Sequence, residues 1–438
     1  MSTPRMSAHF ASRQPSVIRI SQIEFAKRQD GTQAINTAIG NVSLPMHPAM
    51  IERLHQLGAP GSPFEDGVVK YTATVGEAEA NQAFLNIIAS SGFSIEGLQA
   101  QITDGGSQAM ELCAVGLCGP AGSTERPLLL IDAAYTNYKS FTDRLGRPTV
   151  SVCRTLQDDG RFTLPALAEI ERVIVEHRPG AMVVIPYDNP TGHFYDQATL
   201  RGLAELCVRH DVWIISDEAY RELKYTDDEV SSIWGVTEDQ VPGITGRRVS
   251  IETASKVWNA CGLRIGALVT DNPELHDKAV AENTASLCPN TIGQYIFGAL
   301  AHLSREQLGQ LYTRQRGYYR KMLTTFTAQL KELSPDRGVS RPDASIYSVI
   351  DVRKVVEPGF DAMDFVNFCA REGAVDLDGK PFTLLVSPMS GFYSTPPGQP
   401  NPGTTQMRVA YVVSPDEMAQ VPRLFVELLG QYEAKRKG

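Results

Sequence analysis

The residue types best suited to covalent chemistry in this 438-residue sequence lie in one segment, ETASKVWNACGLRIG, from Glu252 to Gly266. Lys256 stands there among hydroxyl and small apolar side chains, and Arg264 follows eight residues later. A lysine buried in a low-dielectric interior loses proton affinity, and its neutral amine can form a Schiff base with an aldehyde. An arginine guanidinium can bind a phosphate through two hydrogen bonds. The segment therefore fits an aldehyde that also carries a phosphate.

Polar side chains also lie at the ends of two apolar runs. The first run, AMVVIPYDNPTG, leads to Asn189, and the second, DVWIISDEAY, leads to Asp217 and Tyr220. Such runs are typical of strands that are buried on both faces. The sequence between them has the apolar spacing of a helix, with Asp196 as its N-cap. A strand, helix and strand at this spacing predict two parallel strands that end at one sheet edge, where Asn189, Asp217 and Tyr220 would converge.

A third unit, LQAQITDGGSQAMELCAVGL, predicts a strand, a glycine turn and a helix. The free N–H groups at a helix start bind phosphate, which would place Gly106 and Ser107 at an anion site. An ordinary strand-to-helix turn explains the pattern equally well. The segment GGSQA also resembles the G-x-S-x-G turn of α/β-hydrolases, in which Ser107 would be the nucleophile. The last glycine is missing, however, and the final histidine, His302, lies far from the chain end.

Composition narrows the possible partners. A net charge of -9 and a pI near 5.5 argue against binding to nucleic acid or to an anionic membrane. The sequence contains neither G-x-G-x-x-G nor G-x-x-x-x-G-K-[ST], and its histidines show no metal-ligand spacing, so we expect no metal. The seven cysteines are scattered, and no segment has the apolar length of a signal peptide or a membrane span. We therefore predict a cytoplasmic protein with reduced thiols.

The segments DNPTG, SDEAYRELKY and TASKVWNACGLRIG, in this order, resemble the signature segments of fold type I pyridoxal-phosphate enzymes. More specifically, they resemble the class I/II aminotransferases of the aspartate aminotransferase superfamily. The resemblance runs from about Asn36 to about Met407. It implies an α/β fold, in which helices sandwich the mainly parallel sheet of a large domain, together with a smaller α+β domain. It also implies a pyridoxal 5'-phosphate-dependent aminotransferase that moves an amino group between an L-amino acid and a 2-oxo acid by a ping-pong mechanism.

The resemblance also implies roles for single residues. Lys256 would be the Schiff-base lysine and proton shuttle, and Asp217 would pair with the pyridinium nitrogen. Asn189 and Tyr220 would contact the ring oxygen, and Tyr135 in DAAYTNY would stack on the ring. The residues implied to hold the phosphate are Gly106, Ser107, Thr253, Ser255 and Arg264.

Further residues correspond to the family's contacts with substrate and partner subunit. Arg408 in MRVAY matches the arginine that binds the substrate α-carboxylate, and Gly40 and Asn189 match residues that approach the substrate. Tyr71 in VKYTATVG resembles the tyrosine that reaches the phosphate of the partner subunit, which implies a homodimer with shared active sites.

Two departures leave the substrate open. The family commonly has Pro-x-Gly-Gly where this sequence has RPDASIY, with Ala344 and Ser345, and TATVGEAEA differs from the more usual version with Pro and Leu. Separately, the long loop GFYSTPPGQPNPGTTQ before Arg408 predicts a lid or an entrance wall. A lyase or decarboxylase with the same cofactor remains an alternative. A transcription regulator that uses this fold to sense an effector would carry a DNA-binding domain before it. Only about 35 residues precede the resemblance, so we do not expect such a regulator.

The predicted domains are an N-terminal arm with part of the small domain at 1–49, a large pyridoxal-phosphate-binding domain at 50–311 and a small C-terminal domain at 312–438. The segment YYRKMLTTFTAQLKEL, at 318–333, predicts a long amphipathic helix that connects the large and small domains.

Overall fold

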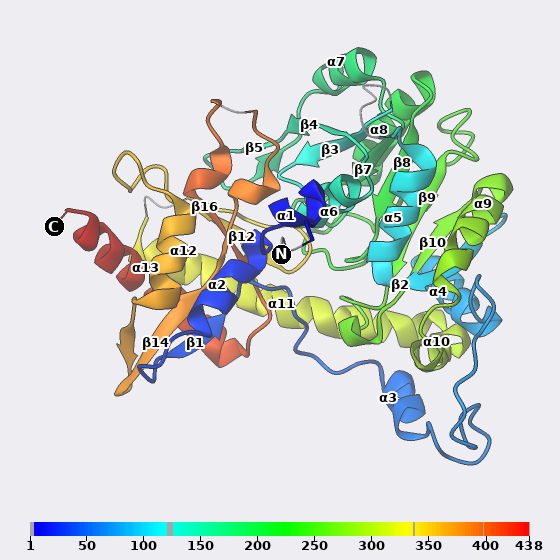
Figure 1. The fold of residues 1–438 in the computed structure, drawn as a ribbon, viewed down its shortest axis with the longest axis horizontal. Helices are drawn as coiled ribbons and strands as arrows, with labels where there is room; N and C mark the ends of the chain where they lie inside the picture. Colours follow the sequence, from blue (N-terminus) through cyan, green and yellow to red (C-terminus); the bar gives the residue numbers. More distant parts are fainter. Residues whose placement is uncertain (1–3, 121–125, 336–337, 397, 438) are drawn as a thin grey trace. The chain divides into compact units, whose positions relative to one another are not determined.

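The computed structural model describes residues 4–120, 126–335, 338–396 and 398–437 (Figure 1). Its contacts divide the chain into two compact units. The large unit comprises Asn41–Lys321 and Arg341–Tyr347, and the small unit comprises Met1–Gly40, Met322–Ser340 and Ser348–Gly438. No helix in the described ranges is both long and apolar enough to cross a membrane.

A seven-stranded sheet forms the centre of the large unit. In spatial order its strands are β2 (Gln99–Asp104), β10 (Ile265–Thr270), β9 (Arg248–Thr253), β8 (Trp213–Asp217), β7 (Ala181–Val184), β3 (Leu128–Asp132) and β4 (Thr149–Cys153). Only β10 runs against its neighbours β2 and β9, and the other pairings are parallel. The predicted α/β class with a mainly parallel sheet is confirmed.

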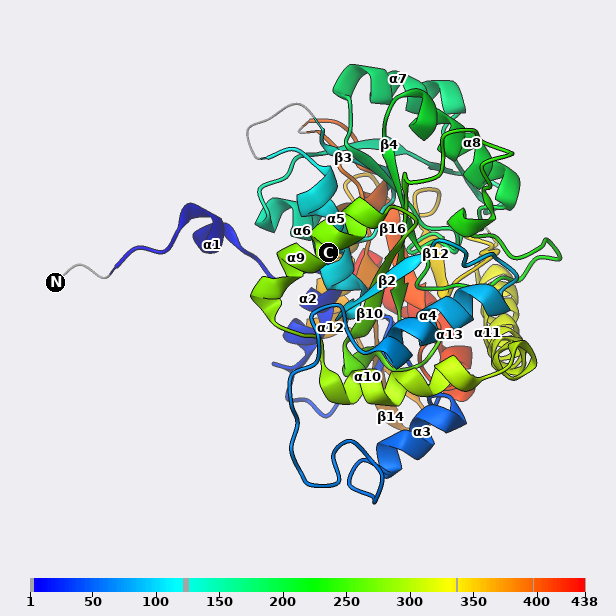
Figure 2. The same cartoon turned by 90° about the vertical axis from the view of Figure 1, so that its right-hand side faces the viewer.

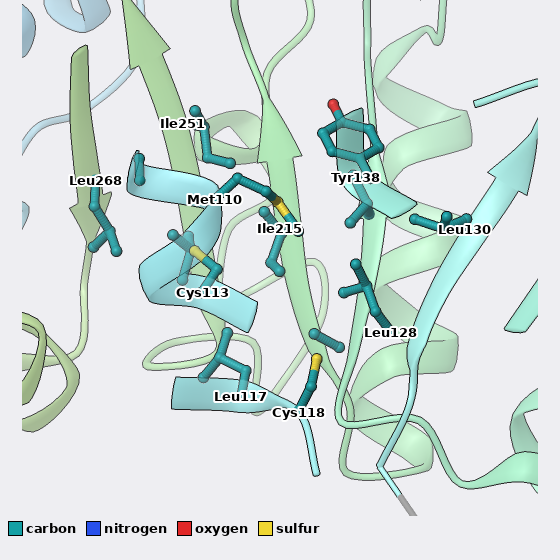
Figure 3. Close-up of a cluster of buried hydrophobic side chains, with 14 of the residues drawn as sticks. Met110, Cys113, Leu117, Cys118, Leu128, Leu130, Tyr138, Ile215, Ile251 and Leu268 are labelled. Atoms are coloured by element: carbon teal, nitrogen blue, oxygen red, sulfur yellow. The ribbon is translucent and has the colours of Figure 1, made fainter. Parts of the chain in front are cut away.

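Helices pack on this sheet and bury its apolar side chains. Helix α5 (Gly105–Leu117) contributes Met110, Cys113 and Leu117 to a core that contains Ile215 and Ile251 of the strands (Figure 3). Helices α6 (Thr136–Arg144) and α9 (Pro273–Asn283) contribute to the same core, whereas α7 (Leu167–His177) and α8 (Gln197–Arg209) contact β4 and β8 (Figure 2). Burial of both faces explains why the strands read as uninterrupted apolar runs.

The predicted β7–α8–β8 unit forms as expected. Asp196 is the N-cap of α8, and its Oδ1 accepts a hydrogen bond of 2.7 Å from the N–H of Thr199. The strands β7 and β8 pair in parallel, with Val184 opposite Ser216. Because the two strands run the same way, the segments that follow them leave the sheet at the same edge.

The remaining elements of the large unit surround this sheet. They are α3 (Pro48–His55), α4 (Ala78–Ser90), β5 (Thr155–Leu156), β6 (Phe162–Thr163), η1 (Ile233–Gly235), η2 (Cys261–Leu263), η3 (Thr284–Ser286), α10 (Thr291–Gly298) and η4 (Ala299–His302).

Helix α11 (Arg305–Leu333) continues from the large unit into the small unit. It begins at Arg305, well before the predicted start at Tyr318. The additional turns bury Leu308, Leu311 and Tyr312, which continue the spacing of one helical face.

The small unit joins residues from both ends of the chain. Strand β1 (Gln33–Asn36) pairs in parallel with β14 (Lys380–Leu385), which also pairs with β13 (Val375–Leu377). A second sheet has the order β11 (Gly338–Val339), β12 (Tyr347–Asp351), β16 (Gln406–Ala410) and β15 (Ser387–Pro388). The helices are α1 (Ala8–Ser12), α2 (Val17–Phe25), α12 (Ala362–Arg371) and α13 (Pro415–Lys437), with the short turns η5 (Ser390–Phe392) and η6 (Pro402–Thr405).

Candidate active site

Polar residues of the large unit gather at the carboxyl edge of its parallel strands. Asp217 is the last residue of β8, and Lys256 lies three residues beyond the end of β9. These strands are neighbours, with Asp217 opposite Ile251. Asn189 follows β7 on the other side of β8, and Tyr135 follows β3. The topology therefore brings to one edge groups that are separated by more than a hundred residues in the sequence.

The start of α5 lies at the same edge, beside Arg264. Strand β10 begins directly after Arg264, and its first residue, Ile265, pairs with Asp104 at the end of β2. Gly105 has a φ of +72°, and a Cβ there would overlap the Arg264 guanidinium. On β10, a Cβ at Gly266 would lie 2.5 Å from backbone atoms of Gly105 and Gly106. Glycine at these positions lets the guanidinium and β10 approach the helix start.

This arrangement can bind an anion. The first N–H groups of a helix lack intrahelical partners and carry partial positive charge, and the N-cap residue of α5, Asp104, does not cap them with its side chain. Ser107 lies in the first turn, and Arg264 adds a full positive charge beside it. Next to Lys256, Thr253 Oγ1 donates to Ser255 Oγ at 2.8 Å. The edge thus presents amides, hydroxyls and a guanidinium, which are the groups that hold phosphate.

Asp217 is a partly buried carboxylate that accepts hydrogen bonds from two donors. The hydroxyl of Tyr138 donates to Oδ2 at 2.5 Å, and the N–H of Ala219 donates to Oδ1 at 3.1 Å. Burial raises the pKa of Asp217, and these two hydrogen bonds oppose that rise. Burial also raises the pKa of Tyr138, so its hydroxyl stays protonated and acts as the donor. The Asp217 carboxylate, held by the Tyr138 hydroxyl, can therefore bind a cation at the end of β8.

The two other polar side chains near Asp217 are held by contacts within the large unit. Tyr220 is buried, and its hydroxyl lies 2.8 Å from the hydroxyl of Tyr347. Asn189 is buried and precedes Pro190 through a cis peptide bond. The preceding residue, Asp188, forms a buried ion pair of 2.8 Å with Arg154. The ion pair of Asp188 with Arg154 holds the turn that carries Asn189.

The ring of Tyr135 lies at the start of α6 and makes an edge-to-face contact with Tyr138, with 5.5 Å between ring centres. Its hydroxyl accepts a hydrogen bond of 2.8 Å from Asn137 Nδ2. Sequence reasoning selected Tyr135 but missed Tyr138 and Tyr347. The spacing of three residues in YTNY, which puts both tyrosines on one side of a helix, is a signal that could have identified Tyr138.

Gly40 and Arg408 belong to the small unit. Arg408 lies on β16 with 1% of its surface exposed, and its Nη2 donates to the carbonyl of Ala38 at 2.7 Å. Its guanidinium carbon lies 5.2 Å from the ring centre of Phe392, in the Pro- and Gly-rich loop. Residue 397 of that loop lies outside the described residues, and the predicted lid stays a prediction.

Tyr71 is a predicted site residue that is exposed to solvent. It lies in the large unit with 79% of its surface exposed, and Val68 and Val69 nearby are 47% and 55% exposed. Three neighbouring apolar or aromatic side chains in solvent form a patch that favours contact with another protein surface.

Comparisons with known proteins agree with this chemistry. The family model of aminotransferase class I and II matches residues 34–420. The aspartate aminotransferase of Thermotoga maritima is 24% identical over 365 residues, which cover 81% of this chain and 87% of that protein. The arginine–pyruvate transaminase of Pseudomonas aeruginosa is 25% identical over 293 residues, which cover 67% and 69% of the two chains.

Solved structures show the same fold. The N-succinyldiaminopimelate aminotransferase from Mycobacterium tuberculosis superposes with a TM-score of 0.79 at 19% identity and covers 97% of this chain and 100% of its own. A single mutant of the Thermus thermophilus aspartate aminotransferase gives a TM-score of 0.78 at 20% identity, with the same coverage. The family match spans most of the chain, so this protein belongs to the class I and II aminotransferases and is a pyridoxal-phosphate-dependent transaminase.

Proposed function

We propose that the cluster at the carboxyl edge of the large-unit sheet is the cofactor site, with Lys256 as its covalent attachment point. The observation that carries the proposal is the convergence of Lys256, Asp217 and Arg264 with the start of α5 at one edge. When bound, pyridoxal phosphate supplies an aldehyde that forms Schiff bases with amines and a ring that withdraws electrons. We assign its aldehyde to Lys256, its ring nitrogen to Asp217 and its phosphate to Arg264 and the start of α5.

The anion site fits the phosphate. Gly105 and Gly266 let Arg264 and β10 lie close to the start of α5, so the guanidinium sits at the positive end of that helix. We assign phosphate binding to Gly106, Ser107, Thr253, Ser255 and Arg264. This assignment follows from charge and hydrogen-bonding capacity, because a phosphate dianion needs several donors in a confined volume.

Asp217 fits the ring nitrogen. A buried carboxylate is costly unless a cation or hydrogen bonds compensate it, and a protonated ring nitrogen would provide the cation. Asn189 and Tyr220 can donate hydrogen bonds to the ring oxygen, and Tyr347 can donate to Tyr220 in turn. Tyr135 offers an aromatic face for stacking.

Lys256 has two tasks in this proposal. Its Nζ would be the attachment point of the cofactor before substrate arrives, and the freed amine would be the base that takes the proton from the substrate α-carbon. Water would release the 2-oxo acid while the cofactor retains the amino group, and a second oxo acid would take up that group in the reverse half-reaction.

Arg408 and Gly40 would bind the substrate carboxylate. A guanidinium on a buried strand offers paired donors with little freedom, which suits a planar carboxylate. Retention of a carboxylate throughout the reaction favours transamination over decarboxylation. We assign cofactor binding to the predicted domain at 50–311 and carboxylate binding to the residues on either side of it.

A homodimer is part of the proposal. The exposed patch formed by Val68, Val69 and Tyr71 would be covered by a second copy, and Tyr71 would reach its phosphate site. Sedimentation of the purified protein tests this proposal. A dimer whose dissociation follows a Tyr71→Ala substitution combined with Val69→Asp supports it, whereas a wild-type monomer at micromolar concentration contradicts it. We also propose that the protein acts in the cytoplasm.

The substrate can be identified by a spectroscopic survey. Each amino acid is added to the cofactor-loaded protein, and the absorption band of the bound cofactor is followed before and after addition of a 2-oxo acid. We expect the amino acids that serve as amino donors to bleach the band and a 2-oxo acid to restore it. Glutamate is the first amino acid to test. Release of carbon dioxide without an oxo acid would instead support the decarboxylase alternative. Inactivation by a serine-directed phosphonate would support a hydrolase that uses Ser107.

A further inference from the structure

Glu218, Arg221 and Glu252 form a buried ionic cluster, and each of them is a sequence neighbour of a proposed cofactor residue. The three side chains are no more than 3% exposed. Arg221 Nη2 lies 2.6 Å from Glu252 Oε1 and 3.5 Å from Glu218 Oε2, and Arg221 Nε donates to Glu252 Oε2 at 3.4 Å. One guanidinium therefore joins two carboxylates in the interior of the large unit.

The cluster spans two of the catalytic segments. Arg221 directly follows Tyr220, and Glu218 directly follows Asp217. Glu252 is the second-last residue of β9, directly before Thr253 and four residues before Lys256. The ion pair between Arg221 and Glu252 thus connects the segment after β8 to the end of β9.

Neutral hydrogen bonds hold both carboxylates in place. Glu218 Oε1 accepts from Ser216 Oγ at 2.9 Å, from Ser232 Oγ at 2.8 Å and from the N–H of Ile233 at 3.1 Å. Glu252 Oε1 accepts from Ser250 Oγ at 2.8 Å. Hydrogen bonds therefore hold the two carboxylates on the sheet and on η1, and the Arg221 side chain joins the two carboxylates.

Stability alone is a weak explanation for such a cluster. Buried ion pairs can often be replaced by apolar side chains with little loss of stability, because desolvation offsets their attraction. Burial also raises the pKa of Glu252, and the Arg221 charge opposes that rise. A charged cluster at this position is better explained by the directional contacts it makes.

We propose that Arg221 is a positioning residue that, through Glu252 and Glu218, sets the separation between the Asp217–Tyr220 segment and the Thr253–Lys256 segment. This inference rests on the proposed cofactor site. It assigns Arg221 no contact with cofactor or substrate, and its effect is transmitted through the backbone of the two segments. A site with loosened geometry binds its ligand less tightly and titrates differently.

The test compares two double variants, each of which removes an ion pair that involves a residue of β9. Arg221→Met with Glu252→Gln removes the bridge at the carboxyl end of β9. Arg248→Met with Asp271→Asn removes a buried ion pair at the amino end of β9, far along the strand from Lys256. Both variants lose a buried pair, but the first also leaves the Glu218 carboxylate without its cation, so circular dichroism and thermal melting must first establish that each variant is folded.

Two readouts other than activity decide between positioning and a merely structural role. They are the dissociation constant of pyridoxal phosphate for the apoprotein and the pH midpoint at which the bound cofactor's absorption changes. We expect the Arg221/Glu252 variant to bind about 10- to 100-fold more weakly and to shift the midpoint, while the Arg248/Asp271 variant keeps wild-type values. Equal values in the two variants would overturn the inference.

A further variant covers the case in which the double substitution does not fold. Arg221→Lys keeps a buried cation but loses the two-nitrogen contact, so it should show the same changes at smaller size. Wild-type affinity and midpoint in a folded Arg221→Lys protein would then overturn the inference. Failure of the wild-type protein itself to bind pyridoxal phosphate would refute the proposed site instead, which keeps the two failures distinct.

Discussion

The hydrogen bond between Tyr138 and Asp217 provides a quantitative test of the site's electrostatics. Tyr138→Phe removes one hydroxyl from the large-unit core and leaves the ring in place. Among the described residues, the N–H of Ala219 is then the remaining hydrogen-bond donor to Asp217. Because burial already raises the pKa of Asp217 and the Tyr138 hydrogen bond lowers it, we expect the substitution to raise that pKa further.

The magnitude depends on pH. A hydrogen bond to a charged acceptor contributes roughly 1.5–3 kcal/mol, and one between neutral groups contributes roughly 0.5–1.5 kcal/mol. The difference of about 1–1.5 kcal/mol corresponds to a rise of about one unit in the pKa of Asp217. The folded protein holds this proton to a higher pH than the unfolded chain does, so its stability falls as pH rises from the unfolded pKa to the folded one. In the variant that fall continues to higher pH.

Urea unfolding of the cofactor-free protein, measured from about pH 4, near the pKa of an aspartate in an unfolded chain, to about pH 9, checks this prediction. We expect the free-energy deficit of Tyr138→Phe to grow with pH and to reach roughly 1.5–3 kcal/mol at the alkaline end. Tyr195→Phe is the matched control, because the Tyr195 hydroxyl is buried and has no hydrogen-bond partner among the described residues. A deficit that is constant with pH, or no larger than that of Tyr195→Phe, would refute the reasoning.

Three further substitutions test neighbouring features. Arg264→Ala should weaken pyridoxal phosphate binding to the apoprotein by roughly 10- to 150-fold, since it removes charge-assisted hydrogen bonds, and an unchanged dissociation constant would contradict the phosphate assignment. Gly266→Ala should destabilise the large unit by about 1–3 kcal/mol in urea, because its Cβ would lie 2.5 Å from backbone atoms of Gly105 and Gly106; wild-type stability would show that this close approach is not required. Burial and the nearby Arg154 guanidinium lower the pKa of His193 to about 3, so His193→Gln should leave the pH dependence of activity unchanged above about pH 5, and a displaced acid limb would count against a neutral His193.

The parts of the fold that depend on local sequence could be predicted. The strand that precedes Asn189 and the strand that ends at Asp217 are apolar runs of the right length, and the cap at Asp196 needs only its own helix. The short segments around Lys256 and Arg264 identified the chemistry because the residue types needed for a phosphorylated aldehyde are restricted.

Contacts between side chains of distant segments could not be predicted. Tyr138 and Asp217 are 79 residues apart, and Arg221 and Glu252 are 31 residues apart. Strands that are buried on both faces show no alternation of apolar and polar residues, so the sequence does not reveal which side chain meets which neighbour. The start of α11 was missed because its first turns mix charged and apolar residues, and tertiary burial of Leu308 and Leu311 decides their structure.

The most direct test of the central claim is to identify the lysine that holds the cofactor. The protein is incubated with pyridoxal phosphate, reduced with borohydride and digested, and the modified peptide is sequenced by mass spectrometry. The proposed site predicts a single pyridoxyl group on Lys256, and no labelling of that peptide in Lys256→Ala. Stoichiometric labelling of another lysine, or an unmodified Lys256 at saturating cofactor, would contradict the assignment.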